Sequence, residues 1–161
     1  MPQLFLVRHA EPELTGVLLG HCDPELSQAG REHASSLLTD VGLFVIYTSP
    51  LRRARQTAEI VARGAHIEIV DDLRDISFGA WDGRRWVEIE KSDPVWAARK
   101  LADWSGVTLP GADRWSDFAA RVRRAFRTIR DGPRPAAVVA HAAVHNVIAG
   151  VDLPYGGVHE I

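Results

Sequence analysis

The stretch Leu4-Phe5-Leu6-Val7-Arg8-His9 (residues 4–9) decides the fold, because four apolar residues run directly into two polar ones. A short and wholly apolar run is typical of a strand that is buried on both faces. Residues 44–47 and 136–140 are two more runs of this kind, and residues 67–70 form a weaker one that Glu68 interrupts. Together the runs predict four strands of a mainly parallel sheet.

Helical patterns separate these strands. Residues 27–38 form one such pattern, and Ser27 is expected to cap its start. The pair Ser49-Pro50 predicts the start of a second helix, with Ser49 as the N-cap and proline at the first helical position. Gly64 is expected to end this helix. The alternation of strands and helices predicts an α/β domain with a three-layer α/β/α arrangement.

A long helix is expected after Asp113, which is its candidate N-cap, and Gly132 and Pro133 should end it. Its apolar residues recur at spacings of three and four, which is typical of a helix with one buried face. They are Trp115, Phe118, Ala119, Val122, Phe126 and Ile129. Residues 80–110 fit the alternation poorly and carry four of the five tryptophans. We expect them to form a small helical lid within one domain that spans residues 1–161.

The composition narrows the possible partners and the compartment. The chain has 46% hydrophobic and 25% charged residues, and its net charge of -2 gives no general attraction to nucleic acid or membrane. Cys22 is the single cysteine, which excludes an internal disulfide and a multi-cysteine metal site. No apolar run approaches the roughly 20 residues that cross a bilayer, and the opening run is too short for a signal peptide. The sequence therefore predicts a cytoplasmic protein.

Polar residues follow the predicted strands at the edge where open α/β sheets bind their ligands. Arg8 and His9 follow the first strand, the segment 49–55 with its arginines follows the second, and His141 follows the fourth. Guanidinium groups bind phosphate through parallel hydrogen bonds, and nearby cations keep a histidine neutral. These residues predict a phosphate pocket that contains a nucleophilic or acid–base histidine.

Four segments resemble, in order, the motifs of the histidine phosphatase (phosphoglycerate mutase-like) superfamily. They are LVRHAE (6–11), TSPLRRARQTA (48–58), LRDISFGAWDG (73–83) and VVAH (138–141). Within the superfamily, the short lid and the segment 109–113 look most like the α-ribazole phosphatase branch.

The resemblance implies a phosphoglycerate mutase-like fold and a metal-independent phosphomonoesterase without a cofactor. It makes His9 the nucleophile that becomes a phosphohistidine, and Arg8, Arg53 and His141 the phosphate-binding residues. His141 also counts among the catalytic residues. Asp75 occupies the position of the acid, where the family usually has glutamate. The implied substrate is a small phosphorylated metabolite, for example α-ribazole phosphate, and inorganic phosphate would also bind.

Several positions depart from the family's pattern. Ala10 replaces the usual glycine after the nucleophile, so its methyl group is expected to crowd the phosphate. Asp75 is one methylene shorter than glutamate, which is expected to weaken proton donation. Thr15 lies near the usual phosphate-binding asparagine and is a candidate substitute for it. The chain ends at Ile161, so we expect the final strand of the family to be missing, and an open sheet edge there would suit a homodimer.

Alternative functions remain open at this stage. His141 and His145 are spaced i and i+4, which suits zinc on a helix, although a third ligand is lacking. The sequence His21-Cys22-Asp23 is more readily a loop beside the pocket than a metal site. A phospholigand binder that has lost catalysis and a phosphoglycerate mutase are further possibilities. Five arginines of the long helix are expected to form its solvent-exposed face rather than bind nucleic acid. They are Arg121, Arg123, Arg124, Arg127 and Arg130.

Overall fold

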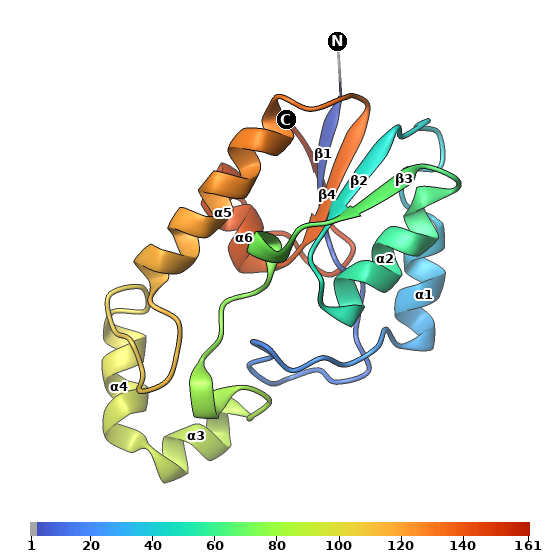
Figure 1. Cartoon of the computed structure of the whole chain (residues 1–161). Coiled ribbons are helices and arrows are strands. Elements are labelled where there is room, and N and C mark those ends of the chain that lie inside the picture. Colours follow the sequence, from blue (N-terminus) through green and yellow to red (C-terminus); the bar gives the residue numbers. More distant parts are fainter. Residues whose placement is uncertain (1–2) are drawn as a thin grey trace.

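Five strands form one sheet in the order β3-β2-β4-β1-β5 in the computed structural model, which describes residues 3–161 (Figure 1). The first four strands are parallel to their neighbours, and β5 runs antiparallel to β1 at one edge. Their bounds are β1 Leu4–Arg8, β2 Val45–Thr48, β3 His66–Ile69, β4 Ala136–Ala140 and β5 Val158–Glu160. The predicted parallel sheet is confirmed.

Helices cover both faces of the sheet, so the molecule has three layers (Figure 1). On one face, α1 (Gln28–Ser35) and α2 (Arg52–Ala62) lie beside strands whose alternate residues, such as Phe5 and Val139, form one apolar cluster. On the other face, α5 (Trp115–Arg130) and α6 (Ala142–Ala149) lie beside a second cluster. The central strands are wholly apolar because both of their faces are covered.

Two of the three predicted helix caps are wrong. Ser27 does cap α1, since its Oγ accepts from Gly30 N at 3.0 Å. However, α2 begins at Arg52 after Leu51, because Ser49 Oγ is bonded to His141 Nε2 at 2.7 Å instead. Likewise α5 begins after Arg114, because Asp113 Oδ2 accepts from Ser77 N at 2.9 Å. Both side chains make long-range contacts and neither caps its helix, although Ser49 Oγ also accepts from Leu51 N at 3.3 Å.

The last strand, which was expected to be missing, is present. β5 is short and pairs with β1, with Val158 opposite Val7 and Glu160 opposite Phe5. Residues 150–157 connect α6 to this strand. At the opposite edge, β3 pairs only with β2 and is largely exposed, which suits the weak apolar character of its sequence.

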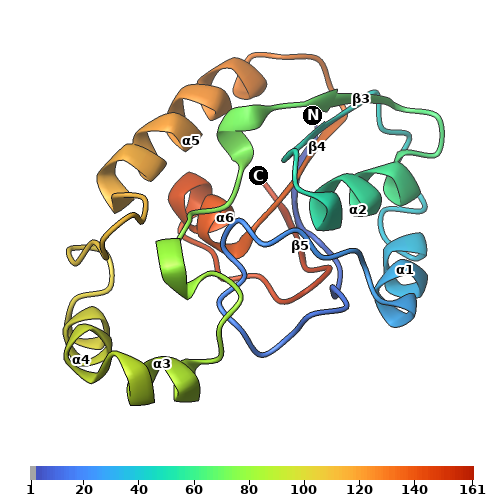
Figure 2. The same ribbon diagram turned by 60° about the horizontal axis from the view of Figure 1, so that its bottom comes forward.

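The segment 80–110 is helical, as predicted, and contains α3 (Trp86–Ser92) and α4 (Pro94–Ala102). These helices lie beyond the end of the sheet, next to the loop that follows β1 (Figure 2). Leu18 joins the two segments, since its N–H donates to Arg84 O at 3.0 Å. No helix among residues 3–161 is long and apolar enough to cross a membrane.

Tryptophans hold this helical segment together. The rings of Trp81 and Trp86 meet edge to face at 5.7 Å, and Trp86 lies 6.0 Å from Trp104. The buried Trp81 also donates from Nε1 to Asp93 Oδ2 at 3.0 Å. These contacts give the segment a small core of its own and account for its high tryptophan content.

Candidate functional site

The carboxyl ends of β1, β2 and β4 bring the predicted polar residues together. Arg8 ends β1 and His9 follows it, Ser49 follows β2, and His141 follows β4. The rings of His9 and His141 lie 5.3 Å apart between centroids. The predicted convergence of two histidines and an arginine at one edge of the sheet is therefore present in the structure.

His9 presents a neutral ring with one free nitrogen. Its Nδ1 lies 2.8 Å from the carbonyl oxygen of Ala10, which can only accept, so Nδ1 carries the proton and Nε2 carries the lone pair. Burial, with further contributions from the Arg53 and Arg8 charges, holds the pKa of His9 well below its ordinary value. The Nε2 of a neutral and fixed imidazole is a competent nucleophile.

His141 presents a second buried nitrogen to the same site. Its Nε2 is bonded to Ser49 Oγ at 2.7 Å, and that hydroxyl also accepts from Leu51 N at 3.3 Å. The Ser49 hydroxyl can therefore donate its hydrogen to His141 Nε2, which then accepts. In the neutral ring the proton is then on Nδ1. This Nδ1 has no hydrogen-bond partner among the described residues and lies 3.7 Å from Asp75 Oδ2. An anion in the site would satisfy it.

Arg8 is fixed at the mouth of the site by the C-terminal segment. Its Nη1 donates to Leu153 O at 3.0 Å, and its guanidinium stacks on Tyr155 at 4.3 Å from the ring centroid. Its Nε is buried and has no partner among the residues described. Tyr155 was not identified from the sequence, because only the fold brings the turn before β5 against β1.

Arg53 lies beneath the site and is fully buried. Its Nη1 donates to Cys22 O at 2.6 Å, and its Nη2 donates to Gly20 O at 2.9 Å and to Asp75 Oδ2 at 3.1 Å. Its Nε has no partner in the described chain. Arg53 therefore places a positive charge under the histidines while most of its donors are already occupied.

Asp75 lies between these groups. Its Oδ1 accepts from Ile76 N at 2.9 Å, and its Oδ2 faces both Arg53 and His141. Burial raises the pKa of Asp75 above its ordinary value and outweighs the opposing effect of the Arg53 charge. A raised pKa makes a carboxyl group better suited to donate a proton.

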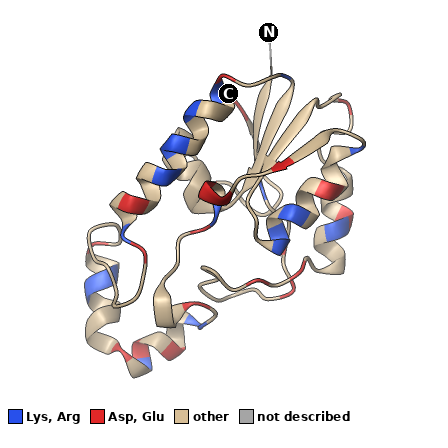
Figure 3. Ribbon diagram, in the orientation of Figure 1, with Lys and Arg blue, Asp and Glu red and all other residues tan. Residues whose placement is uncertain are grey.

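Two side chains from distant segments hold the backbone of Asp75. The carbonyl oxygen of Asp75 accepts from His21 Nε2 at 2.8 Å and from Arg121 Nη2 at 3.0 Å. Arg121 Nη1 donates to the carbonyl oxygens of Asp72 at 2.9 Å and Arg74 at 2.6 Å. The prediction that Arg121 belongs to an exposed arginine face is therefore wrong. The four other arginines of α5 are exposed, and Figure 3 shows them along the helix.

Thr15 and Ala10 do not line the cavity beside His9. Thr15 is exposed in the loop after β1 and does not line the cavity that His9 and Arg8 border, because the residues that turn back toward the site are 17–20. The methyl group of Ala10 packs with Leu26 and Ala34 in a small apolar cluster, so it does not crowd this cavity. The Ala10 N–H donates to Thr57 Oγ1 at 3.0 Å.

His145 does not pair with His141. Its Nε2 bonds the carbonyl oxygen of Val7 at 2.9 Å, so the ring ties α6 to β1. His21 and Asp23 also face other partners, the Asp75 carbonyl and the Arg52 N–H at 2.6 Å. Residues 3–161 contain no group of three or more His, Cys, Asp or Glu side chains arranged to hold a metal ion.

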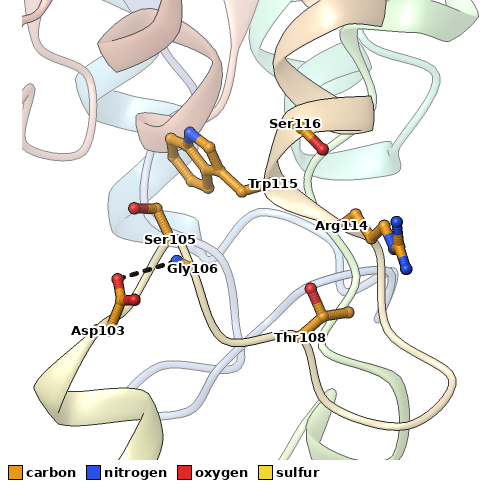
Figure 4. A pocket seen from close by; sticks show the side chains of 7 residues that line it. All are labelled: Asp103, Ser105, Gly106, Thr108, Arg114, Trp115 and Ser116. Carbon is orange, nitrogen blue, oxygen red and sulfur yellow. Dashed lines mark hydrogen bonds between the residues drawn. The ribbon is translucent and has the colours of Figure 1, made fainter.

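Two cavities differ in volume and in the residues that line them. The one beside His9 has a volume of about 230 Å³ and is bordered by Arg8, Asp75 and Tyr155. A wider one of about 540 Å³ lies between the end of α4 and the start of α5, where Asp103 accepts from Gly106 N at 3.0 Å (Figure 4). The wider cavity shares no lining residue with the first, so the histidine chemistry belongs to the smaller one.

The fold and the site define an α/β protein that sets a neutral histidine among groups suited to bind a phosphoryl anion. The chain belongs to the histidine phosphatase superfamily (branch 1), whose sequence profile matches residues 4–154. The family resemblance seen in the sequence is thereby confirmed.

Curated relatives carry several activities. A bifunctional protein of Mycobacterium tuberculosis is 34% identical in an alignment of 164 positions that covers 96% of this chain and 45% of that relative. The chain thus spans less than half the length of this relative. Phosphoserine phosphatase 1 of Hydrogenobacter thermophilus is 31% identical in an alignment of 166 positions that covers 95% of this chain and 79% of that protein.

Solved structures share the whole fold. A phosphoglycerate mutase from Thermus thermophilus is 32% identical with a TM-score of 0.79, and the match covers 99% of this chain and 92% of that one. A putative alpha-ribazole-5'-P phosphatase from Escherichia coli has a TM-score of 0.88 at 23% identity, with 99% and 89% covered. The second likeness shows the phosphoglycerate mutase-like architecture alone.

Proposed function

We propose that the protein is a metal-independent phosphomonoesterase that acts through a phosphohistidine on a small phosphorylated metabolite. The observation that carries this proposal is the free Nε2 of the neutral His9 beside the unpartnered donors of Arg8 and His141, with Asp75 opposite. His9, Arg8 and Asp75 line one cavity, and the buried His141 lies next to them, 3.7 Å from Asp75 Oδ2. The arrangement can supply a nucleophile, donors for phosphoryl oxygens and a proton donor at one site.

The first step forms the covalent intermediate. The lone pair of His9 Nε2 attacks phosphorus in line, and the bond from phosphorus to the ester oxygen breaks. Asp75 gives its proton to that oxygen, so an alcohol leaves and Asp75 becomes a carboxylate. Arg8 and His141 Nδ1 donate to the equatorial oxygens, and Arg53 adds charge from below.

The second step releases phosphate. Asp75, now a carboxylate, takes a proton from a water molecule as the oxygen of that water attacks phosphorus. The bond between phosphorus and His9 Nε2 breaks, and the electron pair returns to the ring. Inorganic phosphate leaves, and Asp75 and His9 have regained their starting states.

Family membership does not determine whether water or a second substrate molecule accepts the phosphoryl group, because the relatives include phosphatases and phosphoglycerate mutases. Hydrolysis is supported by the relative named phosphoserine phosphatase 1, which is 31% identical to this chain and is covered over 79% of its length. α-Ribazole phosphate is one candidate substrate, supported by a structural neighbour of that name. We expect the protein to act in the cytoplasm on small molecules, without nucleic acid or membrane, and a homodimer is consistent with its open edge strand β3.

The test is hydrolysis of p-nitrophenyl phosphate in EDTA by the wild type, His9→Ala and the control His66→Ala. His66 is an exposed histidine on β3, so its loss should leave turnover intact. We expect turnover in the wild type and control, none in His9→Ala, and an acid-labile phosphoryl group on the wild type after rapid quenching. Turnover that needs added zinc would overturn the proposal, and phosphate binding without turnover would identify a non-catalytic binder instead.

A further inference from the structure

The cavity beside His9 has little positive charge beyond what one phosphoryl group needs. Among the described residues that line it, Arg8 is the only arginine or lysine, and Asp75 is the only acidic residue. Most of the remaining wall is apolar and comes from four segments of the chain, at 17–20, 76–78, 142–143 and 155. It includes Val17, Leu18, Leu19, Ile76, Phe78 and Tyr155.

The neighbouring cations are already occupied. Arg53 gives three hydrogen bonds to Gly20, Cys22 and Asp75 beneath the floor of the cavity. His21 and Arg121 both donate to the Asp75 carbonyl, and neither lines the cavity. A second anionic group on a substrate would therefore meet no second free lysine or arginine side chain in the described wall. It would meet apolar side chains and the Asp75 carboxyl, and the donors beside them are backbone N–H groups and the Tyr155 hydroxyl.

Solvation makes this arrangement selective. A carboxylate that leaves water for an apolar wall without a cation or donor loses its hydration and gains nothing in return. An uncharged apolar group in the same place gains free energy by leaving water. The cavity volume of about 230 Å³ is below the range usual for drug-sized ligands, which favours a small leaving group.

We infer that the site selects phosphomonoesters whose leaving group is small, uncharged and apolar or aromatic, and rejects leaving groups that bear a carboxylate or a second phosphate. This inference rests on the proposed phosphomonoesterase function. It separates the chain from relatives whose names include phosphoserine and phosphoglycerate, since both of those molecules carry a carboxylate.

The experiment compares benzyl phosphate with 4-carboxybenzyl phosphate. The two esters have leaving alcohols of similar acidity and differ in one charge, so a difference in kcat/KM reports recognition rather than chemistry. We expect about a 100-fold preference for benzyl phosphate, a factor of ten for each 1.4 kcal/mol of discrimination. Equal kcat/KM values for the two esters would overturn the inference.

A charge added to the wall should reverse part of this preference. Val17 lines the cavity and belongs to no core cluster of the described residues, so Val17→Lys can supply a cation. We expect Val17→Lys to improve the relative use of 4-carboxybenzyl phosphate at least tenfold, whereas the neutral Val17→Met should not change the preference. The same gain in both variants would count against a charge effect.

Binding distinguishes a failure of this inference from a failure of the proposed function. Benzylphosphonate and 4-carboxybenzylphosphonate cannot be hydrolysed, and calorimetry gives their Kd values whether or not the protein is catalytic. Tighter binding of benzylphosphonate without any turnover of esters would support the selectivity and overturn the phosphomonoesterase. Turnover with equal phosphonate affinities and equal kcat/KM would leave the phosphomonoesterase standing and overturn the selectivity.

Discussion

Replacing Arg121 by methionine tests whether the segment around Asp75 is held by a side chain from α5. Arg121 donates to the carbonyl oxygens of Asp72, Arg74 and Asp75 and is 20% exposed. Methionine keeps much of the aliphatic volume but none of the donors. At about 1 kcal/mol net for each bond, the loss should be about 3 kcal/mol of unfolding free energy. For a chain of this size that corresponds to about 6–12 °C in Tm.

Activity should respond differently for different leaving groups. If the Asp75 carboxyl is displaced, proton donation weakens, and a misplacement of about 1 Å can cost roughly 100-fold in rate. Benzyl phosphate needs the proton, whereas p-nitrophenolate leaves well without it. We therefore expect kcat for Arg121→Met to fall about 10- to 100-fold on benzyl phosphate and much less on p-nitrophenyl phosphate, measured well below the Tm of the variant. Arg121→Lys should restore part of the loss.

The matched control is Arg124→Met on the same helix. The Arg124 side chain is 60% exposed and pairs with Asp72 Oδ2 at 2.9 Å, so its removal should cost less than about 1 kcal/mol and leave both rates unchanged. Equal falls on both substrates for Arg121→Met, or a lower Tm with unchanged kcat, would refute the reasoning. Arg121 would then stabilise the fold without positioning Asp75.

Three further predictions concern single residues. Because burial raises the pKa of Asp75, its proton should be lost as pH rises through that pKa. The kcat/KM for benzyl phosphate should fall in that pH range, whereas the kcat/KM for p-nitrophenyl phosphate should fall little. A flat pH profile for benzyl phosphate would contradict the assignment of Asp75 as the proton donor. Ala10→Gly should lower stability by about 1–2 kcal/mol in urea unfolding without raising kcat, since the methyl group packs on Leu26 and Ala34; faster turnover would show that it crowds phosphate after all. Burial lowers the pKa of His145 to about 4, so its contribution to stability is complete above pH 6.5 and is lost as pH falls toward 4. The contribution is about 3 kcal/mol. In urea unfolding, His145→Gln should lose less free energy of unfolding between pH 7 and pH 4.5 than the wild type does. An equal loss in the two proteins would contradict the prediction.

The sequence was informative where a residue's role depends on its neighbours along the chain. Short apolar runs predict the strands, and Arg8, His9 and His141 come at the ends of these runs. Because the carboxyl ends of parallel strands lie at one edge of the sheet, the local sequence alone places these residues together. The prediction failed for Ser49 and Asp113, whose side chains have strong local capping propensity. Partners that are distant in sequence, His141 and Ser77, bind these side chains instead.

Other site residues could not be found without the fold. Arg121 lies in a helix with four similar arginines, and only the packing of α5 against residues 72–75 separates it from them. Tyr155 and His21 reach the site from loops whose paths the sequence does not determine. Thr15 failed as a candidate for the same reason, since the loop after β1 turns toward the site two residues later.

The strand order has a consequence for how the protein is made. β1 carries Arg8 and leads into His9 and is synthesised before the other four strands, yet both of its neighbours in the sheet, β4 and β5, follow more than 120 residues later. Until these two strands are available, the apolar run of β1 has two unpaired edges, and such edges favour aggregation and chaperone binding. Pairing over this separation is slow to nucleate. The site therefore forms only after β4 has been made, and no nascent fragment that lacks β4 can hold the two histidines together.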